Sequence, residues 1–405
     1  MLPIYKETDF RDVKKFYLML GTACNMHCRH CIQMPIKGNN FHLTSLDMDE
    51  RVASLAENYI KFCVNYNLPP KNKPYYMYFW GGEPLLYWNF IKKYVVKMTE
   101  KYDMLRNRNI RFRMTTNGTL LTDEMIDFFN KYQVKVHFSY DAPWPFAVRD
   151  YVSDEVCEKV KRIHGHEIQC NYSAYNCDQM LALKCSKTKF PEAHVQVNLK
   201  MMRTFEDMPE DAYRYDLNKV RTAIRKIRIA FQMGDSYFRN WVLNRFLIPG
   251  KISRGYFIPD VGNERLLCVG LNGDIHLGFN IDIPVTTVDD SLNTVYKKIF
   301  DVKVDLLGPA CKICRNRDIC KAPLYDIHDE SGNFVSCLSF YIKYYDIVRE
   351  EMEKTKYFLT KEDVDWYHEQ EKIMEKQVQV YLNEGKRYEK EHTRLPKDMM
   401  YMINS

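Results

Sequence analysis

The sequence predicts an α/β protein built on a parallel β-sheet that is open or partly closed. Short apolar runs alternate about six times with stretches of helical periodicity, which is typical of parallel strands joined by helices. Several runs end in Gly, Thr, Asn or Asp, which favour turns and loops. Hydrophobic residues make up 46% of the chain and charged residues 28%, so a disordered, collagenous or coiled-coil protein is excluded.

The expected elements follow in chain order. Residues 16–20 form an apolar run that ends at Gly21 and predict the first strand, and residues 47–66 have a helical pattern. A Pro-, Lys- and Asn-rich break at 68–74 precedes the second strand. The other expected elements are strands at 75–80, 110–115, 134–140, 168–174 and 195–201, and helices at 85–105, 123–132 and 178–185. Ligands bind at the carboxyl ends of parallel strands, so we expect the site in the loops that follow them.

The 405 residues suggest two to three domains. The strand and helix alternation ends near residue 234, so residues 1–234 are predicted to form the sheet domain. Residues 235–345 contain short strands around an Asn272-Gly273 hairpin signal and form a second predicted domain. Residues 346–405 are a charged helical extension, expected to cover the sheet domain or form a dimer contact, with a substrate lid or docking arm as the alternative.

Charge and hydropathy indicate which partners and which cellular compartment to expect. The 59 Lys and Arg and 53 Asp and Glu residues give a net charge of +6 without a concentrated basic patch, so a nucleic-acid partner is not expected. The first 15 residues lack the apolar segment of a signal peptide, and the chain has no run of 18 apolar residues. The sequence therefore predicts a cytoplasmic protein without a membrane partner.

The 13 cysteines include two tight groups. The first has the spacing C-x3-C-x2-C after the first expected strand, and the second has the spacing C-x2-C-x5-C with one later cysteine. Their members are Cys24, Cys28 and Cys31, and then Cys311, Cys314, Cys320 and Cys337. In a reducing compartment such groups more often bind metal than form disulfides. Three cysteines complete a tetrahedral zinc site only if His27 or His30 is the fourth ligand, whereas a three-thiolate iron–sulfur cluster leaves one iron open to a small molecule.

With Gly81-Gly82-Glu83-Pro84 after the second strand, the first cysteine group resembles the radical S-adenosylmethionine (radical SAM) superfamily over residues 15–234. The resemblance implies a partial (β/α)6 TIM-like barrel, a [4Fe–4S] cluster on Cys24, Cys28 and Cys31, and S-adenosylmethionine on the fourth iron. The contacts that it implies for S-adenosylmethionine are Gly81, Gly82 and Glu83 at the methionine ammonium, His30 near the adenine, Ser139 and Asp141 near the ribose, and Arg149 at the carboxylate. Thr116 and Asn117 are further candidates, with a plain turn as the alternative.

Two positions depart from the family pattern. His30 stands where the family usually has an aromatic residue, and Ala142 replaces a usual glycine.

The second cysteine group resembles the SPASM-type auxiliary-cluster domain. This resemblance implies that Cys311, Cys314, Cys320 and Cys337 hold one auxiliary [4Fe–4S] cluster, although four thiolates suit zinc equally well. Gly278 and Leu324 stand where a full SPASM domain has further cysteines. A single auxiliary cluster is therefore expected, with Cys268 an unpaired remnant or a substitute for Cys337.

The resemblance implies an enzyme that reductively cleaves S-adenosylmethionine to a 5′-deoxyadenosyl radical, which takes hydrogen from a substrate C–H bond. An external flavodoxin- or ferredoxin-type protein is the expected electron donor. The SPASM-type region favours a ribosomally made peptide or protein as substrate, altered by cross-linking, oxidation or epimerisation. Two alternatives stay open: radical chemistry on a small molecule such as a sugar, nucleoside or amino acid, and a non-catalytic metal-binding scaffold.

Overall fold

The computed structural model describes about half of the chain, and all statements below concern these residues. They are residues 13–26, 28, 31, 54, 56–61, 74–106, 110–141, 149, 152–172, 178–199, 216–238, 265–270, 273–276, 286–291, 294, 298, 315 and 342–391. Within the helix expected at 47–66, residues 54 and 56–61 are helical.

A nine-stranded sheet forms the centre of the molecule. Its strands are β1 (Val13–Met19), β2 (Tyr75–Trp80), β3 (Ile110–Thr116), β4 (Lys135–Ser139), β5 (Glu167–Tyr172), β6 (His194–Leu199), β7 (Arg265–Val269), β8 (Asp274–His276) and β9 (Thr286–Thr287). They lie in the order β6-β5-β4-β3-β2-β1-β7-β8-β9. The pairs from β6 across to β7 are parallel, and β8 and β9 add on antiparallel. The expected mostly parallel, partly closed α/β sheet is therefore confirmed.

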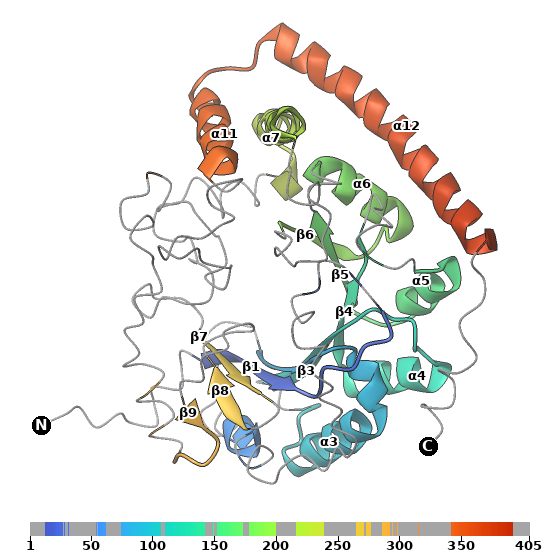
Figure 1. Ribbon diagram of the computed structural model, residues 1–405, viewed down its shortest axis with the longest axis vertical. Coiled ribbons are helices and arrows are strands. Elements are labelled where there is room, and N and C mark those ends of the chain that lie inside the picture. The colour runs from blue at the N-terminus through green and yellow to red at the C-terminus, as the bar shows by residue number, and fades with distance from the viewer. Residues whose placement is uncertain are drawn as a thin grey trace, which may run out of the picture.

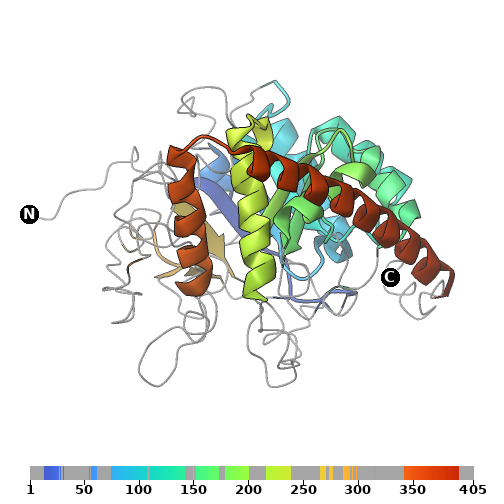
Figure 2. The same cartoon turned by 90° about the horizontal axis from the view of Figure 1, so that it is seen from above.

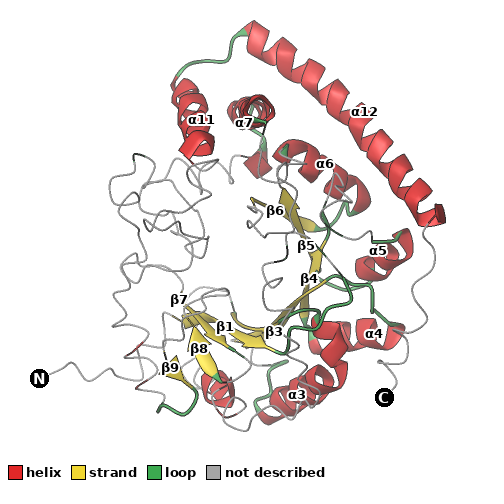
Figure 3. Ribbon diagram, viewed as in Figure 1, coloured by secondary structure: helices red, strands yellow, loops and turns green. Residues whose placement is uncertain are grey.

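Helices cover one face of this sheet. They are η2 (Pro84–Tyr87), α3 (Trp88–Lys101), α4 (Asp123–Tyr132), α5 (Asp154–Lys161), α6 (Gln179–Lys189), α7 (Leu217–Gln232), α11 (Ile342–Glu353), η6 (Lys354–Lys356) and α12 (Lys361–Glu391). Because β1 to β6 lie side by side in chain order, right-handed crossovers place every connecting helix on the same side. Figure 1 shows α3 to α6 along the outside of the arc of strands, and Figure 3 shows the same layering by element type.

Helix starts have a local cause in the sequence. The side chains of Thr122, Ser153, Asp178 and Asp216 accept hydrogen bonds from backbone N–H groups in the first turns of α4, α5, α6 and α7. Such caps satisfy donors that have no partner within the helix. The sequence analysis did not expect α5 or α7, although Ser153 and Asp216 are ordinary capping residues.

The main core lies between the sheet and these helices. Phe16, Phe79, Phe112, Phe138 and Ile168 come from five neighbouring strands and are almost completely buried there. Successive strand residues point to opposite faces, so the residues between them form the second, inner face of the sheet. That face has no helix of α3 to α6 against it (Figure 1).

The sheet extends beyond the domain boundary expected near residue 234. Strand β7 lies in the predicted second domain, yet it pairs in parallel with β1, from Val13 opposite Arg265 to Leu18 opposite Val269. The hairpin expected at Asn272-Gly273 is consistent with the antiparallel pairing of β7 and β8 on either side of it. Strand β7 therefore belongs to the same sheet as β1 to β6, although it lies after the predicted boundary at residue 234.

The charged tail packs on the outside of the barrel. Helix α12 runs across α6 and α7, as the two perpendicular views show (Figures 1 and 2), and buries Tyr367, Met374 and Val378. This is the covering role expected of the tail. None of the helices in the described ranges has the length and apolar character needed to cross a bilayer.

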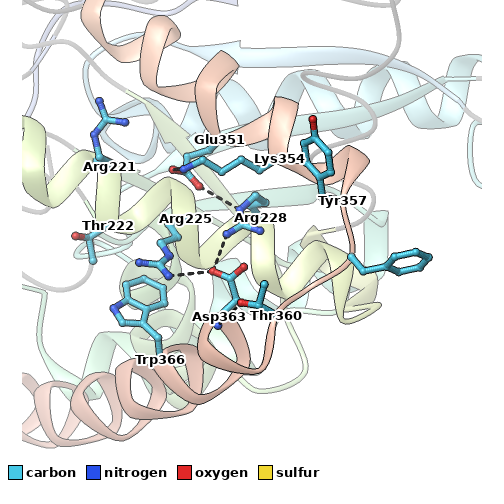
Figure 4. Close-up of a pocket in the computed structure, with 11 residues that line it drawn as sticks. Arg221, Thr222, Arg225, Arg228, Glu351, Lys354, Tyr357, Thr360, Asp363 and Trp366 are labelled. Atoms are coloured by element: carbon cyan, nitrogen blue, oxygen red, sulfur yellow. Dashed lines mark hydrogen bonds and ion pairs between the residues drawn. The ribbon is translucent and has the colours of Figure 1, made fainter.

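Ion pairs join α7, α11 and α12 around a pocket of about 560 Å³ (Figure 4). The guanidinium of Arg228 lies 3.1 Å from Glu351 through Nε and 3.0 Å from Asp363 through Nη2. Arg225 is 2.9 Å from the same Asp363 oxygen and stacks on Trp366 at 4.1 Å from the ring centroid. These partners come from three helices, so the network fixes the tail to the barrel.

Candidate functional site

The first cysteine group follows β1 at the carboxyl edge of the sheet. Cys24 and Cys31 are half-buried, Cys28 is buried, and none of the three forms a disulfide. The N–H of Cys31 donates to the Cys28 carbonyl at 3.1 Å, and the N–H of Met26 lies 3.4 Å from the Cys24 sulfur as a donor. Three reduced thiols on one short loop suit a thiolate-ligated cluster.

The neighbouring histidines cannot be assessed in the same way. His27 and His30 lie outside the described residues, so the adenine contact expected of His30 stays a prediction. Among the described side chains, which include Cys24, Cys28 and Cys31, no three Cys, His, Asp or Glu residues are grouped closely enough to hold a single metal ion, so a cluster on the three cysteines stays a prediction.

Gly81 and Gly82 bring the loop after β2 against the cysteine loop. The N–H of Gly82 donates to the Gly21 carbonyl at 2.8 Å, and the N–H of Glu83 donates to the Ala23 carbonyl at 2.7 Å. A Cβ on Gly82 would lie 1.9 Å from the Ala23 oxygen, and Gly81 has a φ of 147° that disfavours other residues. The absence of side chains at Gly81 and Gly82 thus lets the backbone of the cysteine loop lie against the loop after β2. The contact of these glycines with the methionine ammonium stays a prediction.

Glu83 lies at the centre of three loops and is only 1% exposed. Its Oε1 accepts hydrogen bonds from the Thr116 hydroxyl at 2.6 Å and the Leu85 N–H at 3.0 Å, and its Oε2 accepts from the Asn117 N–H at 2.8 Å. Burial raises the pKa of Glu83, and these hydrogen bonds oppose the rise. The carboxylate therefore links the end of β2 to the end of β3, a role that the sequence analysis did not foresee.

Asn117 is drawn toward the cysteine loop by its side chain. Its Nδ2 donates to Asn25 Oδ1 at 2.9 Å, and Asn25 Nδ2 donates to the Thr119 hydroxyl at 2.7 Å. The Thr119 hydroxyl in turn donates to Asn117 Oδ1 at 2.6 Å, which closes a ring of three side chains. The same Asn117 Nδ2 lies 4.0 Å from the Cys24 sulfur.

Asp141 and Arg149 form a buried pair after β4. Arg149 Nε donates to Asp141 Oδ2 at 2.7 Å, and both side chains are mostly enclosed. Burial lowers the pKa of Arg149, but the Asp141 carboxylate and then the Cys28 and Cys31 sulfurs outweigh it, so the pKa is raised overall. Arg149 is thus a permanent cation beside the cysteine loop. Ser139, the last residue of β4, is half-buried on the inner face of the sheet.

The inner face carries a polar cluster that the sequence analysis missed. Arg113 Nη1 donates to the Tyr78 hydroxyl at 2.6 Å, and its guanidinium lies over the Tyr76 ring at 4.1 Å. In the sheet, Tyr78 pairs with Arg113 and His137 pairs with Glu167. These neighbours place aromatic, cationic and anionic groups side by side.

Glu167 is the hub of this inner cluster. Its Oε2 lies 2.8 Å from His137 Nε2 and 3.6 Å from Arg113 Nη2, and its Oε1 pairs with Lys135. Burial acts to raise the pKa of Glu167, but its contacts with His137 and Lys135 and the Arg113 charge lower it to about 2. Burial lowers the pKa of His137, so its imidazole is neutral at pH 7.

A signal for the cluster was present in the sequence. Arg-Phe-Arg at 111–113, Lys-Val-His at 135–137, Glu-Ile-Gln at 167–169 and His-Val-Gln at 194–196 alternate polar and apolar residues. Parallel strands buried on both faces usually have continuous apolar runs. The alternation therefore indicates a sheet with one apolar face and one polar face, as a chamber for a polar ligand requires.

Cys268 belongs to the inner face of the sheet. It is 2% exposed and packs with Tyr17 and Tyr78, whose rings stack 4.2 Å apart. Burial raises the pKa of its thiol to about 12. A buried, protonated thiol within β7 packs like a small apolar side chain, whereas the substitution of Cys268 for Cys337 stays a prediction because Cys337 lies outside the described residues.

The second cysteine group falls outside the described residues, so its ligand role stays a prediction. Its members are Cys311, Cys314, Cys320 and Cys337. Arg315, which directly follows Cys314 in the chain, is described: its Nε donates to Asp346 on α11 at 2.9 Å, and its carbonyl accepts from Arg349 at 2.9 Å. The chain next to Cys314 therefore contacts α11.

The part of the chain that carries β1 to β5 and the cysteine loop is similar to known proteins. Residues 18–177 match the model of the radical SAM superfamily. The radical SAM cyclopropyl synthase TigE of Paramaledivibacter caminithermalis is 27% identical over 169 residues, which are 41% of this chain and 35% of that enzyme. The serine-type anaerobic sulfatase-maturating enzyme of Bacteroides thetaiotaomicron is 31% identical over 141 residues, 33% of this chain and 31% of the relative. The match thus spans about a third of these relatives.

Solved structures share the fold. Native anSMEcpe with bound AdoMet superimposes with a TM-score of 0.57 at 16% identity, covering 84% of this chain and 99% of that one. The structure of native anSMEcpe with bound AdoMet and Cp18Cys peptide also superimposes with a TM-score of 0.57 at 16% identity. This match covers 84% of this chain and 98% of that chain. At this level of identity the likeness concerns the fold.

Proposed function

We propose that the protein is a radical SAM enzyme that modifies a ribosomally made peptide or protein, because residues 18–177 match the model of the radical SAM superfamily. One observation carries the proposal. The loops after β1, β2, β3 and β4 meet at one edge of the sheet and connect the three cysteines, Glu83, Asn117 and the Asp141–Arg149 pair through hydrogen bonds and charge.

In this proposal Cys24, Cys28 and Cys31 hold a [4Fe–4S] cluster. When bound, the cluster and S-adenosylmethionine supply a 5′-deoxyadenosyl radical that takes hydrogen from a substrate C–H bond. The chain itself shapes the site: Gly81 and Gly82 let the second loop reach the cysteine loop, and Glu83 sets its distance from β3. Arg149 holds positive charge beside the thiolates or the cofactor carboxylate.

The roles of Ser139 and Asp141 near the ribose and of His30 near the adenine are part of the same proposal. The Asp141 carboxylate is buried and accepts a hydrogen bond from Arg149 Nε at 2.7 Å. This contact keeps Asp141 and Arg149 beside the cysteine loop.

The second cysteine group is proposed to hold one auxiliary [4Fe–4S] cluster in a domain covering residues 235–345. Contact between Arg315 and α11 supports a compact arrangement at this point of the chain. A flavodoxin- or ferredoxin-type protein is the proposed electron donor.

The polar inner face supports a polar substrate. Arg113, Lys135, Glu167 and the half-buried Gln169 and Gln196 offer donors and acceptors beneath the proposed radical site. A peptide carries a backbone amide at every residue and can use such a face at several points. The peptide-bound fold neighbour has the same barrel architecture.

Anaerobic reconstitution tests the enzyme. We expect about eight irons per chain for two four-iron clusters, and 5′-deoxyadenosine on addition of dithionite and S-adenosylmethionine. Replacing Cys24, Cys28 and Cys31 with Ala should remove four irons and all product. The control replaces the buried Cys157 and Cys185 with Ala and should keep both. Continued cofactor cleavage by the triple variant would contradict the assignment.

The substrate is tested separately with short peptides encoded beside the gene. A peptide substrate should raise 5′-deoxyadenosine formation. It should also lose hydrogen mass if it is cross-linked or oxidised, or change the configuration of a residue at unchanged mass if it is epimerised. If no such peptide has this effect while sugars, nucleosides or amino acids do, the small-molecule alternative replaces the peptide.

A further inference from the structure

The side-chain amide of Asn117 has a defined orientation. Its Oδ1 accepts hydrogen bonds from the N–H of Thr119 at 3.0 Å and from the Thr119 hydroxyl at 2.6 Å. The Nδ2 end therefore faces the cysteine loop, where it donates to Asn25 Oδ1 and lies 4.0 Å from the Cys24 sulfur. Asn117 is buried, and its partners Asn25 and Cys24 are half-buried.

Glu83 fixes the backbone that carries this amide. Its Oε2 accepts the Asn117 N–H at 2.8 Å, while its Oε1 accepts the hydroxyl of the preceding Thr116. Asn25, the partner of the amide, lies one residue after Cys24. Asn117 therefore contacts the buried Glu83 carboxylate through its backbone N–H and the Cys24 sulfur through its side chain.

Two N–H donors from different segments face the same sulfur. One is the backbone N–H of Met26 at 3.4 Å, and the other is the side chain of Asn117. A hydrogen bond to a ligand sulfur draws electron density from it and stabilises the more negative, reduced form of an iron–sulfur cluster.

We propose that Asn117 is a positioning residue that raises the reduction potential of the catalytic cluster through its N–H contact with the Cys24 sulfur. This inference rests on the proposed function, since it requires a cluster on Cys24. It differs from the expected direct contact between Asn117 and S-adenosylmethionine, because the amide oxygen and nitrogen are directed at Thr119, Asn25 and the sulfur.

The test is a redox titration of the reconstituted protein followed by electron paramagnetic resonance. The signal that changes on addition of S-adenosylmethionine identifies the catalytic cluster. Asn117→Ala removes the donor and should make reduction about tenfold less favourable, which is ~59 mV for a one-electron couple. Asn117→Asp keeps the shape and the Oδ1 contacts with Thr119 but replaces the donor by an anionic acceptor, so it should lower the potential further.

Thr122→Ala is the matched control in the same connection between β3 and α4. Thr122 caps α4 by accepting the Met125 N–H at 3.2 Å, so its loss should lower the midpoint of thermal unfolding and leave the potential unchanged. A variant at Asn117 that retains four irons at an unshifted potential overturns the proposal. Loss of the cluster from the isosteric Asn117→Asp also overturns it, in favour of a purely structural role. Absence of iron from the wild-type protein would instead refute the proposed function.

Discussion

Glu167→Gln is the sharpest test of the polar inner face. The substitution keeps the shape of the side chain and removes the charge that faces His137, Arg113 and Lys135. The pKa of Glu167 is about 2 in the folded protein against an ordinary value of 4.5. At ~1.36 kcal/mol per pKa unit, this difference corresponds to roughly 3 kcal/mol. Breaking a buried ion pair typically costs about 3–5 kcal/mol, so the two arguments agree.

The pH dependence of this effect has a definite sign. A carboxyl group whose pKa is lower in the folded state stabilises the protein above the unfolded-state pKa, and this stability is lost as the pH falls from 4.5 toward 2. The free energy of unfolding of the wild type should therefore exceed that of Glu167→Gln by about 3 kcal/mol at pH 7 and by about 1 kcal/mol at pH 3.

Urea unfolding followed by circular dichroism at the two pH values measures both quantities. The control is Glu158→Gln, which breaks an exposed ion pair with Lys161 on α5 and should cost less than about 0.5 kcal/mol. If Glu167→Gln unfolds at the same urea concentration as the wild type at pH 7, or its deficit does not shrink at pH 3, the interpretation of the inner cluster is wrong.

Three further predictions concern other parts of the structure. Gly82→Ala places a methyl group 1.9 Å from the Ala23 carbonyl, so we expect the reconstituted variant to lose the four irons of the catalytic cluster; full iron content would refute the close approach. Cys268→Val should keep full iron content and 5′-deoxyadenosine formation, because the thiol packs within the sheet, and a loss of iron would show that it is a ligand after all. Arg228→Met removes one of the two cations that pair with the buried Glu351, the other being Lys354, and should lower the free energy of unfolding by about 2 kcal/mol, with thermal unfolding as the measurement; an unchanged midpoint would contradict a fixed tail.

The sequence alone was sufficient for the parallel sheet and for the place of the site. Six of its strands were expected to within a few residues, because apolar runs and the turn residues after them are local features. The three cysteines, Gly81-Gly82-Glu83 and Asn117 could be placed at strand ends for the same reason. Spacing along the chain was also sufficient to separate the two cysteine groups.

The contacts of these residues were not accessible in this way. The cofactor contacts that the sequence suggested for Glu83 and Asn117 stay predictions. Only the described structure shows that Glu83 accepts hydrogen bonds from Thr116 and Leu85 and that Asn117 donates to Asn25. Glu83 and Thr116 are 33 residues apart, so only the packing of β2 beside β3 brings them together.

Strand β7 and the inner cluster illustrate the same division. Residue types determined that a sheet forms, that cysteines lie at its carboxyl edge and that alternating positions are polar. The tertiary structure decided that β7 pairs with β1 and that Cys268 is buried against Tyr17 and Tyr78. It also decided that the Glu167 carboxylate contacts Arg113, Lys135 and His137. Periodicity and turn chemistry act over a few residues, whereas the pairing of strands and the pKa of a buried carboxylate depend on neighbours from distant segments, which only the folded chain brings together.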